Sequence, residues 1–341
     1  MRLFYISSGC GFSFSPTLTA EDDSIIRAFR QLEKERAGFK LQTFLLKREP
    51  LNQLLPRIRA FRPDVVLVLK GFRFSYTLVQ AIRQSGYRIG VWLVDDPYRL
   101  QTHQKITAPY HFVLTQEASC VPVYRQSGKV SLHMPLAVDP QKYYAKKIVP
   151  KKYTSDICFV GSGFPARIAL FDKLAPFLRE KKTIIIGQWW KRLRTYRALK
   201  QCILNRPVPP SEVTNYYNGA KIVLNIHRTA NDRGENVRHV PAVTPNHRAF
   251  EIAACGAFQL ASHRKETFRY FKRGELVTFN DWRDLQQKID YYLQHSEKRT
   301  AVASRGWIRA RTDHTYKKRL TDLIEHLNAY VLAETGRGER E

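Results

Sequence analysis

The stretch NHRAFEIAACGAFQLAS, residues 246–262, decides the fold that we expect for this chain. Phe250 and Ile252, with the alanines that follow, predict the buried first turns of a helix. Gly256 predicts the end of that helix, because glycine adopts a positive φ without strain, and the AFQLAS after it predicts a short buried strand. Glu251 is the one acid of the stretch and falls in the first helical turn, where the helix dipole favours a negative charge. Its carboxylate is either a plain N-terminal charge or a group that holds a pair of ligand hydroxyls.

The rest of the chain alternates short apolar runs with amphipathic helical stretches, in two series. The first series predicts strands within residues 2–7, 39–46, 64–70, 88–94, 111–115 and 131–140. The second series predicts strands within residues 155–162, 182–187, 220–227 and 257–262. Alternation of strands and helices favours parallel sheets covered by helices. We therefore predict an α/β protein with two Rossmann-like, parallel-sheet domains.

The domain boundary is expected where the periodicity stops, in residues 140–152, which are rich in Lys, Tyr and Pro. We predict a first domain at residues 1–145, a second at residues 146–315, and a C-terminal helix at residues 316–341 that packs back across the domains. Open parallel sheets bind ligands beyond the carboxyl ends of their strands, where the strand order reverses. Two such domains facing each other would form a cleft, so the residues directly after strands are the candidates for function.

The charge balance of the chain points to anionic partners. Lys and Arg number 57 against 30 acids, which gives a formal net charge of +27. The excess is spread over both halves of the chain, which argues against a separate basic tail. The partners that fit are nucleotide phosphates, an anionic polymer, nucleic acid or a membrane surface.

The cysteines and the apolar runs indicate where the protein acts. The five cysteines form no CxxC pair, which favours free thiols in a reducing compartment over disulfides or a zinc site. No apolar run approaches the roughly 20 residues that a membrane-spanning helix needs. The first residues, MRLFYISSGCGFSF, lack the long apolar core and cleavage site of a signal peptide. We expect a soluble, cytoplasmic protein.

Glycine-containing loops follow the first strand of each series. Gly9 and Gly11 let the backbone approach a ligand or the facing domain closely, although a tight turn explains them equally well. In the second series, VGSGFPAR places Gly161 and Ser162 before a helix whose N-terminal N–H groups can bind an anion. Arg167, in the first turn of that helix, is placed to reach a diphosphate; the alternative is an arginine that faces solvent.

Arg248 precedes Glu251 by three residues, so both side chains lie on one face of the expected helix. One interpretation is an ordinary surface pair, which stabilises a helix only slightly. In the other, Arg248 contacts a phosphate and the planar carboxylate of Glu251 accepts from both ribose hydroxyls, as acids do in dinucleotide sites. His227, directly after a strand of the same domain, is a further candidate for the donor site.

Two adjacent acids, Asp95 and Asp96, end a strand of the first domain in VWLVDDPYR. A carboxylate there could deprotonate an acceptor hydroxyl as a general base, if burial raises its pKa. The alternatives are a divalent metal site and simple capping of a helix by an acid before proline. The choice between these roles stays open at this stage.

A basic aromatic segment, GQWWKRLRTYRALK, follows the second strand of the second domain. Aromatic side chains interleaved with cations can hold sugar rings or single-stranded nucleic acid. The alternative is an amphipathic surface segment whose tryptophans pack inward. The candidates for contact with an acceptor or polyanion are Trp189, Trp190, Lys191 and Arg192.

Several of these stretches together resemble the C-terminal domain of GT-B glycosyltransferases of the family 4 group, and most closely the CgeB-like (spore maturation protein) branch. They are DICFVGSGFPAR, VLNIHR, NHRAFEIAACGAFQLAS, GELVTFNDWRDLQQKIDYYLQH and TYKKRL, which span most of residues 156–320. The N-terminal half is similar only in its strand order and in VDDP, LTQEAS and LAVDP.

This resemblance implies a GT-B fold, with a nucleotide sugar bound by the second domain and the acceptor by the first. The ribose-binding glutamate of the family falls on Glu251, and its phosphate-binding cation falls on Arg167. The sequence departs from the broader group at two positions: Val243 replaces a second glutamate, and Ser162 replaces an arginine. The donor site implied in this way consists of Gly161, Ser162, Arg167, His227, Arg248 and Glu251.

The function that we expect is transfer of a sugar from a nucleotide sugar, with a UDP-sugar favoured, to an acceptor hydroxyl. The resemblance implies no metal and no cofactor besides the donor. The net charge favours an anionic polymer, a spore or cell-envelope component, or a lipid-linked acceptor at the inner face of a membrane. Two other classes stay open, a nucleic-acid-binding or nucleic-acid-modifying protein on the same fold and a catalytically inactive assembly protein of the spore or envelope.

Overall fold

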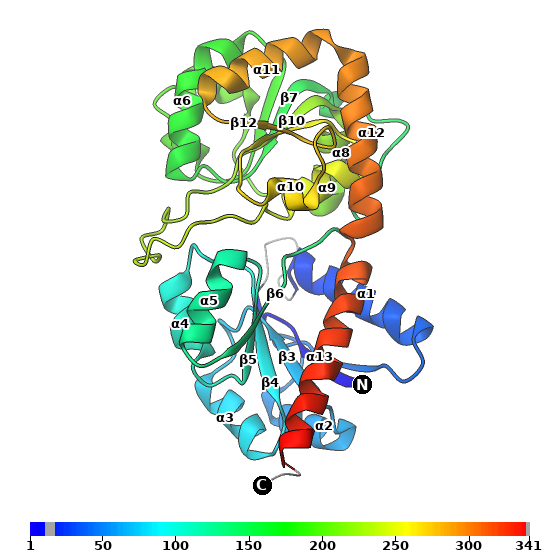
Figure 1. Cartoon of the computed structure of the whole chain (residues 1–341). Coiled ribbons are helices and arrows are strands. Elements are labelled where there is room, and N and C mark those ends of the chain that lie inside the picture. The colour runs from blue at the N-terminus through cyan, green and yellow to red at the C-terminus, as the bar shows by residue number, and fades with distance from the viewer. Residues whose placement is uncertain (11–17, 339–341) are drawn as a thin grey trace. The chain divides into compact units, whose positions relative to one another are not determined.

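The computed structural model describes residues 1–10 and 18–338, with side chains as far as Leu332. The chain forms two compact units. The first unit comprises residues 1–136, 233–242 and 316–341, and the second comprises residues 137–232 and 243–315. Within the described residues each unit is built on one parallel six-stranded sheet with helices around it, as Figure 1 shows. The predicted α/β class is therefore confirmed.

The sheet of the first unit has the strand order β2-β1-β3-β4-β5-β6. Its strands are β1 (Arg2–Ile6), β2 (Lys40–Phe44), β3 (Val65–Leu69), β4 (Ile89–Leu93), β5 (Phe112–Thr115) and β6 (Val130–His133). All five residues of β3 are fully buried. A strand with no polar position fits a sheet whose two faces are both covered by helices.

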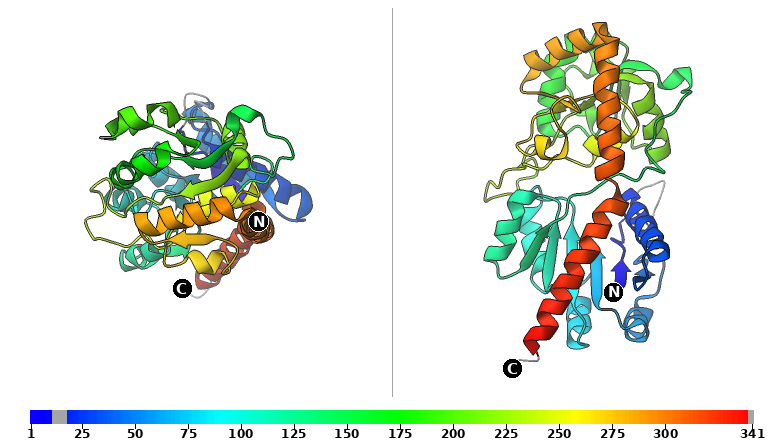
Figure 2. Two further views of the ribbon diagram at one scale, coloured as in Figure 1. Left: turned by 90° about the horizontal axis from the view of Figure 1, so that it is seen from above. Right: turned by 45° about the vertical axis from the view of Figure 1, so that its right-hand side comes forward.

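Helices from both ends of the chain cover the first sheet. They are α1 (Ala20–Glu35), η1 (Leu51–Gln53), α2 (Leu54–Phe61), α3 (Tyr76–Gln84), α4 (Leu100–Thr107), η2 (Ala118–Cys120), α5 (Val121–Gln126) and α13 (Tyr316–Gly338). Thr19 and Asp22 form a capping box at the start of α1. Figure 1 shows α13 crossing close to α1 at an angle, Figure 2 shows the same two helices from two further sides, and Lys317 pairs with Glu35 at 2.6 Å. The C-terminal helix thus belongs to the first unit.

The sheet of the second unit has the order β12-β11-β10-β7-β8-β9, so the strand order reverses between β7 and β10. Its strands are β7 (Ser155–Val160), β8 (Thr183–Ile186), β9 (Ile203–Leu204), β10 (Ala220–Asn225), β11 (Gln259–Ser262) and β12 (Val277–Phe279). The carboxyl ends of β7 and β10 are therefore where a ligand site is expected in this unit.

Two helical layers cover the second sheet. The helices are η3 (Lys151–Tyr153), α6 (Pro165–Arg179), η4 (Trp190–Arg192), α7 (Tyr196–Leu199), η5 (Lys200–Cys202), α8 (Pro210–Gly219), α9 (Arg248–Ala254), α10 (Thr267–Tyr270), α11 (Trp282–Gln294) and α12 (Ser296–Asp313). One buried cluster joins α8 and α9 to the sheet, and another joins α6 and α11 to it. The stretch 246–262 folds as predicted, with α9 ending before Gly256, whose φ is +68°, and β11 following.

The division of the chain differs from the predicted ranges in two respects. The first unit ends at Leu136 rather than at residue 145. Residues 233–242, which lie between β10 and α9 in the sequence, belong to the first unit. The short strands β9 and β12 were also absent from the predicted set, because three residues or fewer give no periodicity to detect.

Candidate functional site

Glu251 lies in the first turn of α9 and is only 8% exposed. Its Oε2 atom has no hydrogen-bond partner in the part of the chain that the structure describes. A histidine and an arginine flank the carboxylate, with His247 Nε2 at 3.9 Å from Oε1 and Arg248 Nη1 at 3.9 Å from Oε2. Both separations exceed a hydrogen bond. A buried carboxylate oxygen without a donor is costly, which indicates that a ligand supplies one.

Two tyrosines, Tyr143 and Tyr217, complete the surroundings of Glu251, and no motif or periodicity pointed to either of them. Burial, followed by the charge of Glu251, raises the pKa of Tyr143 well above its usual range. Burial also raises the pKa of Tyr217, against the charge of the adjacent Arg248, and its hydroxyl makes no hydrogen bond of ordinary geometry among the described residues. Both phenols therefore stay protonated and can donate. A carboxylate that accepts and a phenol that donates together suit a pair of ligand hydroxyls.

His227 follows β10 and is 8% exposed. Ser262 Oγ accepts from the His227 backbone N–H at 2.9 Å and lies 2.9 Å from His227 Nδ1. The assignment that satisfies these atoms has the Ser262 hydroxyl donating to Nδ1, which leaves the ring proton on Nε2. Nε2 has no partner within the described chain. Burial, then the charges of Arg264 and Arg167, hold the pKa of His227 well below its usual range, so the ring is neutral.

His227 lines a cavity of about 440 Å³ in the second unit. Its walls come from α6 and from the loops after β10, β11 and β12, at the carboxyl edge of the sheet. A volume of this size is within the range of small-molecule sites. Arg228 is held in this wall by Asp232, which accepts from its guanidinium at 2.7 and 2.8 Å. The cavity thus offers a neutral imidazole N–H and a fixed guanidinium to a ligand.

The structure gives Arg167 a role different from the predicted phosphate contact. Its side chain is buried, and its guanidinium donates to the Ile226 carbonyl at 2.6 and 2.9 Å and to the Ser162 carbonyl at 3.0 Å. It therefore ties the loop after β7 to the loop after β10. Gly161 is needed beside it, since a Cβ there would lie 2.9 Å from Arg167 Nη1. The contacts that the structure gives Arg167 and Gly161 are thus contacts within the second unit.

The basic aromatic segment also separates into two groups. Trp190 is fully buried and donates its indole N–H to the Gly161 carbonyl at 2.9 Å. It therefore cannot contact an acceptor or polyanion, contrary to the prediction. Trp189, by contrast, is 37% exposed, with Lys191 and Arg192 exposed beside it. The alternation follows from the turn of η4, which directs one tryptophan into the core and leaves its neighbour outside.

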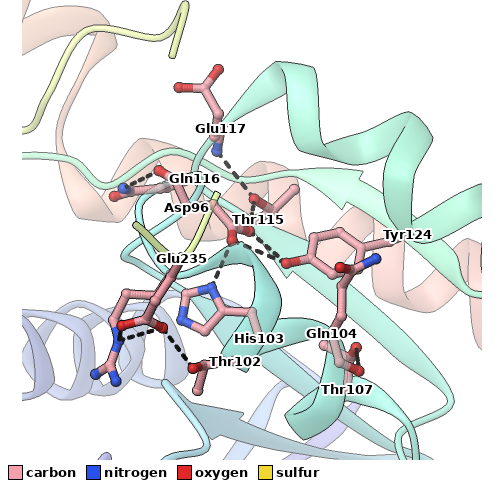
Figure 3. Close-up of polar contacts among 11 residues, drawn as sticks. Asp96, Thr102, His103, Gln104, Thr107, Thr115, Gln116, Glu117, Tyr124 and Glu235 are labelled. Atoms are coloured by element: carbon pink, nitrogen blue, oxygen red, sulfur yellow. Dashed lines mark hydrogen bonds and ion pairs between the residues drawn. The ribbon is translucent and has the colours of Figure 1, made fainter. Parts of the chain in front are cut away.

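In the first unit, the two adjacent acids after β4 have different surroundings, and Figure 3 shows those of Asp96. Asp96 is 1% exposed and accepts from His103 Nδ1 at 2.6 Å, from Thr115 Oγ1 at 2.6 Å and from the Tyr124 hydroxyl at 2.9 Å. These donors hold the Asp96 carboxylate within its own unit. Asp95 is only half-buried. Of the predicted catalytic pair, Asp95 is therefore the one that remains a candidate.

Glu235 holds residues 233–242 in place within the first unit (Figure 3). Its carboxylate accepts from Thr102 Oγ1 at 2.6 Å and pairs with Arg99 at 3.4 Å. Burial opposes the charge, but the Thr102 hydrogen bond and the Arg99 charge keep the pKa of Glu235 below its usual range. Asn236 is fully buried and bonds to the N–H and carbonyl of Val240. The segment is an integral part of this unit.

The glycine loop after β1 is described only in part. Gly9 has a φ of +62°, and a Cβ there would lie 3.1 Å from side-chain atoms of Leu46 and Arg73. Close packing within the first unit therefore explains this glycine. Gly11 lies outside the described residues.

Among residues 1–10 and 18–338, no group of three or more His, Cys, Asp or Glu side chains could hold a metal ion. In the same part of the chain, no helix is both long and apolar enough to cross a membrane.

Comparisons with known proteins agree with this geometry. Residues 167–325 match a family model described as glycosyl transferase-like. The chain is 26% identical over 318 residues to the spore protein CgeB of Bacillus subtilis (strain 168), covering 90% of this chain and 92% of that protein. The chain resembles CgeB-like glycosyltransferases of the GT-B fold. The predicted resemblance is thus confirmed.

Solved structures show the same GT-B fold. A sucrose-phosphate synthase from Thermosynechococcus elongatus matches with a TM-score of 0.66 and 11% identity, over 98% of this chain and 100% of that one. Anabaena HepE, solved in complex with UDP and glucose, matches with a TM-score of 0.60 and 13% identity, over 96% of this chain and 100% of that one. At such identities the likeness establishes the fold alone.

Val243 stands where the broader group has a second glutamate, but the carboxylate of another residue, Glu266, lies close to this position. The Glu266 backbone N–H donates to the Val243 carbonyl at 3.1 Å, and Thr244 Oγ1 donates to Glu266 Oε2 at 3.3 Å. Glu266 is 9% exposed. Sequence spacing could not reveal this acid, because it comes from the loop after β11 and not from the segment before α9.

Proposed function

We propose that this chain is a glycosyltransferase that takes its sugar from a nucleotide donor, with a UDP-sugar favoured. The observation that supports this most is the unpartnered Oε2 of Glu251, at the N-terminus of α9 and near the point where the strand order reverses. Glu251 accepts from the two ribose hydroxyls, and Tyr217 donates to one of their oxygens. A planar carboxylate suits a vicinal diol, as in dinucleotide sites.

The cavity beside His227 takes the rest of the donor in this proposal. Its imidazole N–H donates to a sugar or phosphate oxygen, and Arg228 adds positive charge near the leaving diphosphate. Arg248, with a side chain 30% exposed, is the further candidate for phosphate contact. The HepE structures with UDP, and with UDP-glucose, support a UDP-sugar by analogy of fold.

The acceptor side is assigned to the first unit. Asp95 is the proposed general base that takes the proton of the acceptor hydroxyl. The proposed acceptor is an anionic envelope or spore polymer or a lipid-linked molecule, because the net charge is +27. A metal-independent reaction in the cytoplasm stays part of this proposal.

A thermal-shift titration with a panel of nucleotides and nucleotide sugars tests the donor site. A ligand at 100 times its Kd adds about 2.7 kcal/mol to the free energy of unfolding, which raises Tm clearly. We expect a rise with one base, lost in Glu251→Ala and kept in Asp156→Asn, which removes an acid at the opposite end of β7. No rise with any nucleotide for the folded wild type would exclude a nucleotide-sugar transferase.

A further inference from the structure

An exposed cationic surface lies on the second unit between β8 and β9, and we call it the η4–α7 surface. Residues 189–200 contain five cations and no acid. All five cations are exposed, as is the tryptophan that precedes them. The surface consists of Trp189, Lys191, Arg192, Arg194, Arg197 and Lys200.

This surface is held on a fixed framework. Trp190, Leu193 and Leu199 point into the core of the unit, with exposed fractions of 0%, 4% and 0%. The Trp190 backbone N–H donates to Asn205 Oδ1 at 2.9 Å. Thr195 donates to Asp172 through its N–H at 3.0 Å and its hydroxyl at 2.8 Å. Because the apolar side chains at three-residue spacing turn inward, the charged ones between them face outward together.

The positive charge of this surface is not balanced locally. No ion pair is found, among the described residues, for Lys191, Arg192, Arg197 or Lys200. Asp172 is the nearby acid, and it faces Thr195 and Arg194. A cluster of exposed, unpaired cations raises the local potential and attracts a polyanionic partner.

Trp189 narrows the choice of partner. Its indole is 37% exposed and is held edge-on against Phe164, with ring centroids 5.3 Å apart. A single exposed indole among lysines and arginines is typical of protein surfaces that meet the headgroup layer of a bilayer. Binding of single-stranded nucleic acid uses several stacking aromatics, and here Trp190 is buried. The surface therefore fits an anionic lipid bilayer better than a nucleic acid.

We propose that the η4–α7 surface binds the phosphate headgroups of an anionic bilayer. The cations contribute the electrostatic attraction, and Trp189 inserts its indole at the level of the headgroups. This binding does not depend on the transferase proposal, because it needs neither donor nor acceptor. If both hold, the carboxyl edge of the second sheet, to which Trp189 belongs, acts at a membrane.

Co-sedimentation with vesicles of phosphatidylcholine, with and without phosphatidylglycerol, tests this proposal. We expect the full chain to bind only the anionic vesicles, and less so at high salt. Each Lys or Arg near an anionic surface contributes about 1 kcal/mol, so the triple variant Lys191→Ala, Arg192→Ala, Arg197→Ala should bind about a hundredfold more weakly. Trp189→Ser should weaken binding without changing the charge.

The matched control is a second triple variant that removes the same charge from exposed positions elsewhere in the second unit. Its substitutions are Arg179→Ala, Lys272→Ala and Arg273→Ala. It should bind almost as well as the wild type. Equal losses in the two triple variants would mean that net charge alone is responsible, and would overturn the proposal. So would tight binding to a single-stranded oligonucleotide with none to anionic vesicles. Nucleotide-induced thermal shifts in each variant report separately on the transferase site.

Discussion

Asp96 and Glu251 are both buried carboxylates near the carboxyl edge of a parallel sheet, and they differ in their partners. Asp96, 1% exposed, accepts hydrogen bonds from three side chains of its own unit. Glu251, 8% exposed, has an oxygen with no hydrogen-bond partner within the described residues, and the nearest nitrogens of His247 and Arg248 are 3.9 Å away.

This difference in hydrogen bonding distinguishes a buried carboxylate that stabilises the fold from one that is available to a ligand. A carboxylate whose oxygens are all satisfied contributes to stability, and its removal leaves its donors unpaired. A carboxylate with an open oxygen lowers stability until a ligand donates to it. Opposite effects of mutation on stability and on ligand affinity are therefore expected at the two sites.

The largest expected effect is a loss of stability in Asp96→Ala. The substitution leaves the donors of His103, Thr115 and Tyr124 buried without an acceptor. We expect the free energy of unfolding to fall by about 3–5 kcal/mol, as when one partner of a buried pair is removed. Urea denaturation followed by circular dichroism measures it. The control is the half-buried neighbour, Asp95→Ala, which should cost less than about 1 kcal/mol; similar losses in both variants would contradict the assignment.

Glu251→Ala should show the reverse pattern. Its free energy of unfolding should fall by no more than about 1 kcal/mol, because Oε2 has no partner to lose and the Tyr143 hydroxyl is the group that loses an acceptor. Its affinity for the nucleotide that stabilises the wild type should fall about a hundredfold, since bonds to a charged group contribute about 1.5–3 kcal/mol each. Isothermal titration calorimetry gives the Kd. A variant that loses stability but keeps its affinity would place Glu251 with Asp96 as a structural acid.

The buried imidazole of His227 makes the stability of the folded protein depend on pH. The folded state holds the pKa of His227 well below 6.5, through burial and then the charges of Arg264 and Arg167. The unfolded chain takes up this proton at about pH 6.5, so folding loses stability as the pH falls below that value. The contribution of this one group reaches about 1.4 kcal/mol per pH unit.

Urea denaturation between pH 7.5 and about pH 5 measures that contribution. His227→Gln should lose stability less steeply than the wild type on acidification. His326→Gln, at an exposed histidine of α13, should follow the wild-type curve. Parallel curves for the wild type and His227→Gln would show that His227 is protonated in the folded state.

Sequence periodicity was sufficient to predict the fold, but it predicted the candidate site only in part. Apolar runs and glycine stops determined the two series of strands, because buried parallel strands and helix ends impose a local pattern. Glu251 was found because an acid in an apolar helix violates that pattern. The adjacent acids Asp95 and Asp96 could not be told apart, since the partners of Asp96 come from α4, β5 and α5.

The differences between the predicted and the observed contacts of the site also arise from residues that are far apart in the sequence. Arg167 was expected to face a phosphate, but its acceptors are carbonyls at Ile226 and Ser162. Residues 233–242 are polar and have no periodicity, so nothing local predicts that they belong to the first unit. Contacts between residues far apart in sequence decide these roles, and a single sequence does not encode them in spacing.

Removal of the Tyr217 hydroxyl gives the smallest expected effect, and it tests whether Glu251 has help in binding the ligand. This hydroxyl is buried beside Glu251 and the Arg248 guanidinium and, in the described part of the chain, makes no hydrogen bond of ordinary geometry. Tyr217→Phe removes only that oxygen, so packing and stability should hold within about 0.5 kcal/mol. If the hydroxyl donates to the bound nucleotide, the Kd should rise about fivefold, as one neutral hydrogen bond contributes about 1 kcal/mol.

Tyr216→Phe, at the residue of α8 that precedes Tyr217, is the matched control. The Tyr216 hydroxyl donates within the protein, to Glu212 Oε1 at 3.4 Å, and not toward Glu251. Calorimetry should therefore show an unchanged Kd for Tyr216→Phe beside the weaker binding of Tyr217→Phe. If both variants bind as the wild type does, the ligand donates to Glu251 without help from Tyr217. If Tyr217→Phe is markedly destabilised instead, its hydroxyl has a partner in solution, and the open site consists of the Glu251 oxygen alone.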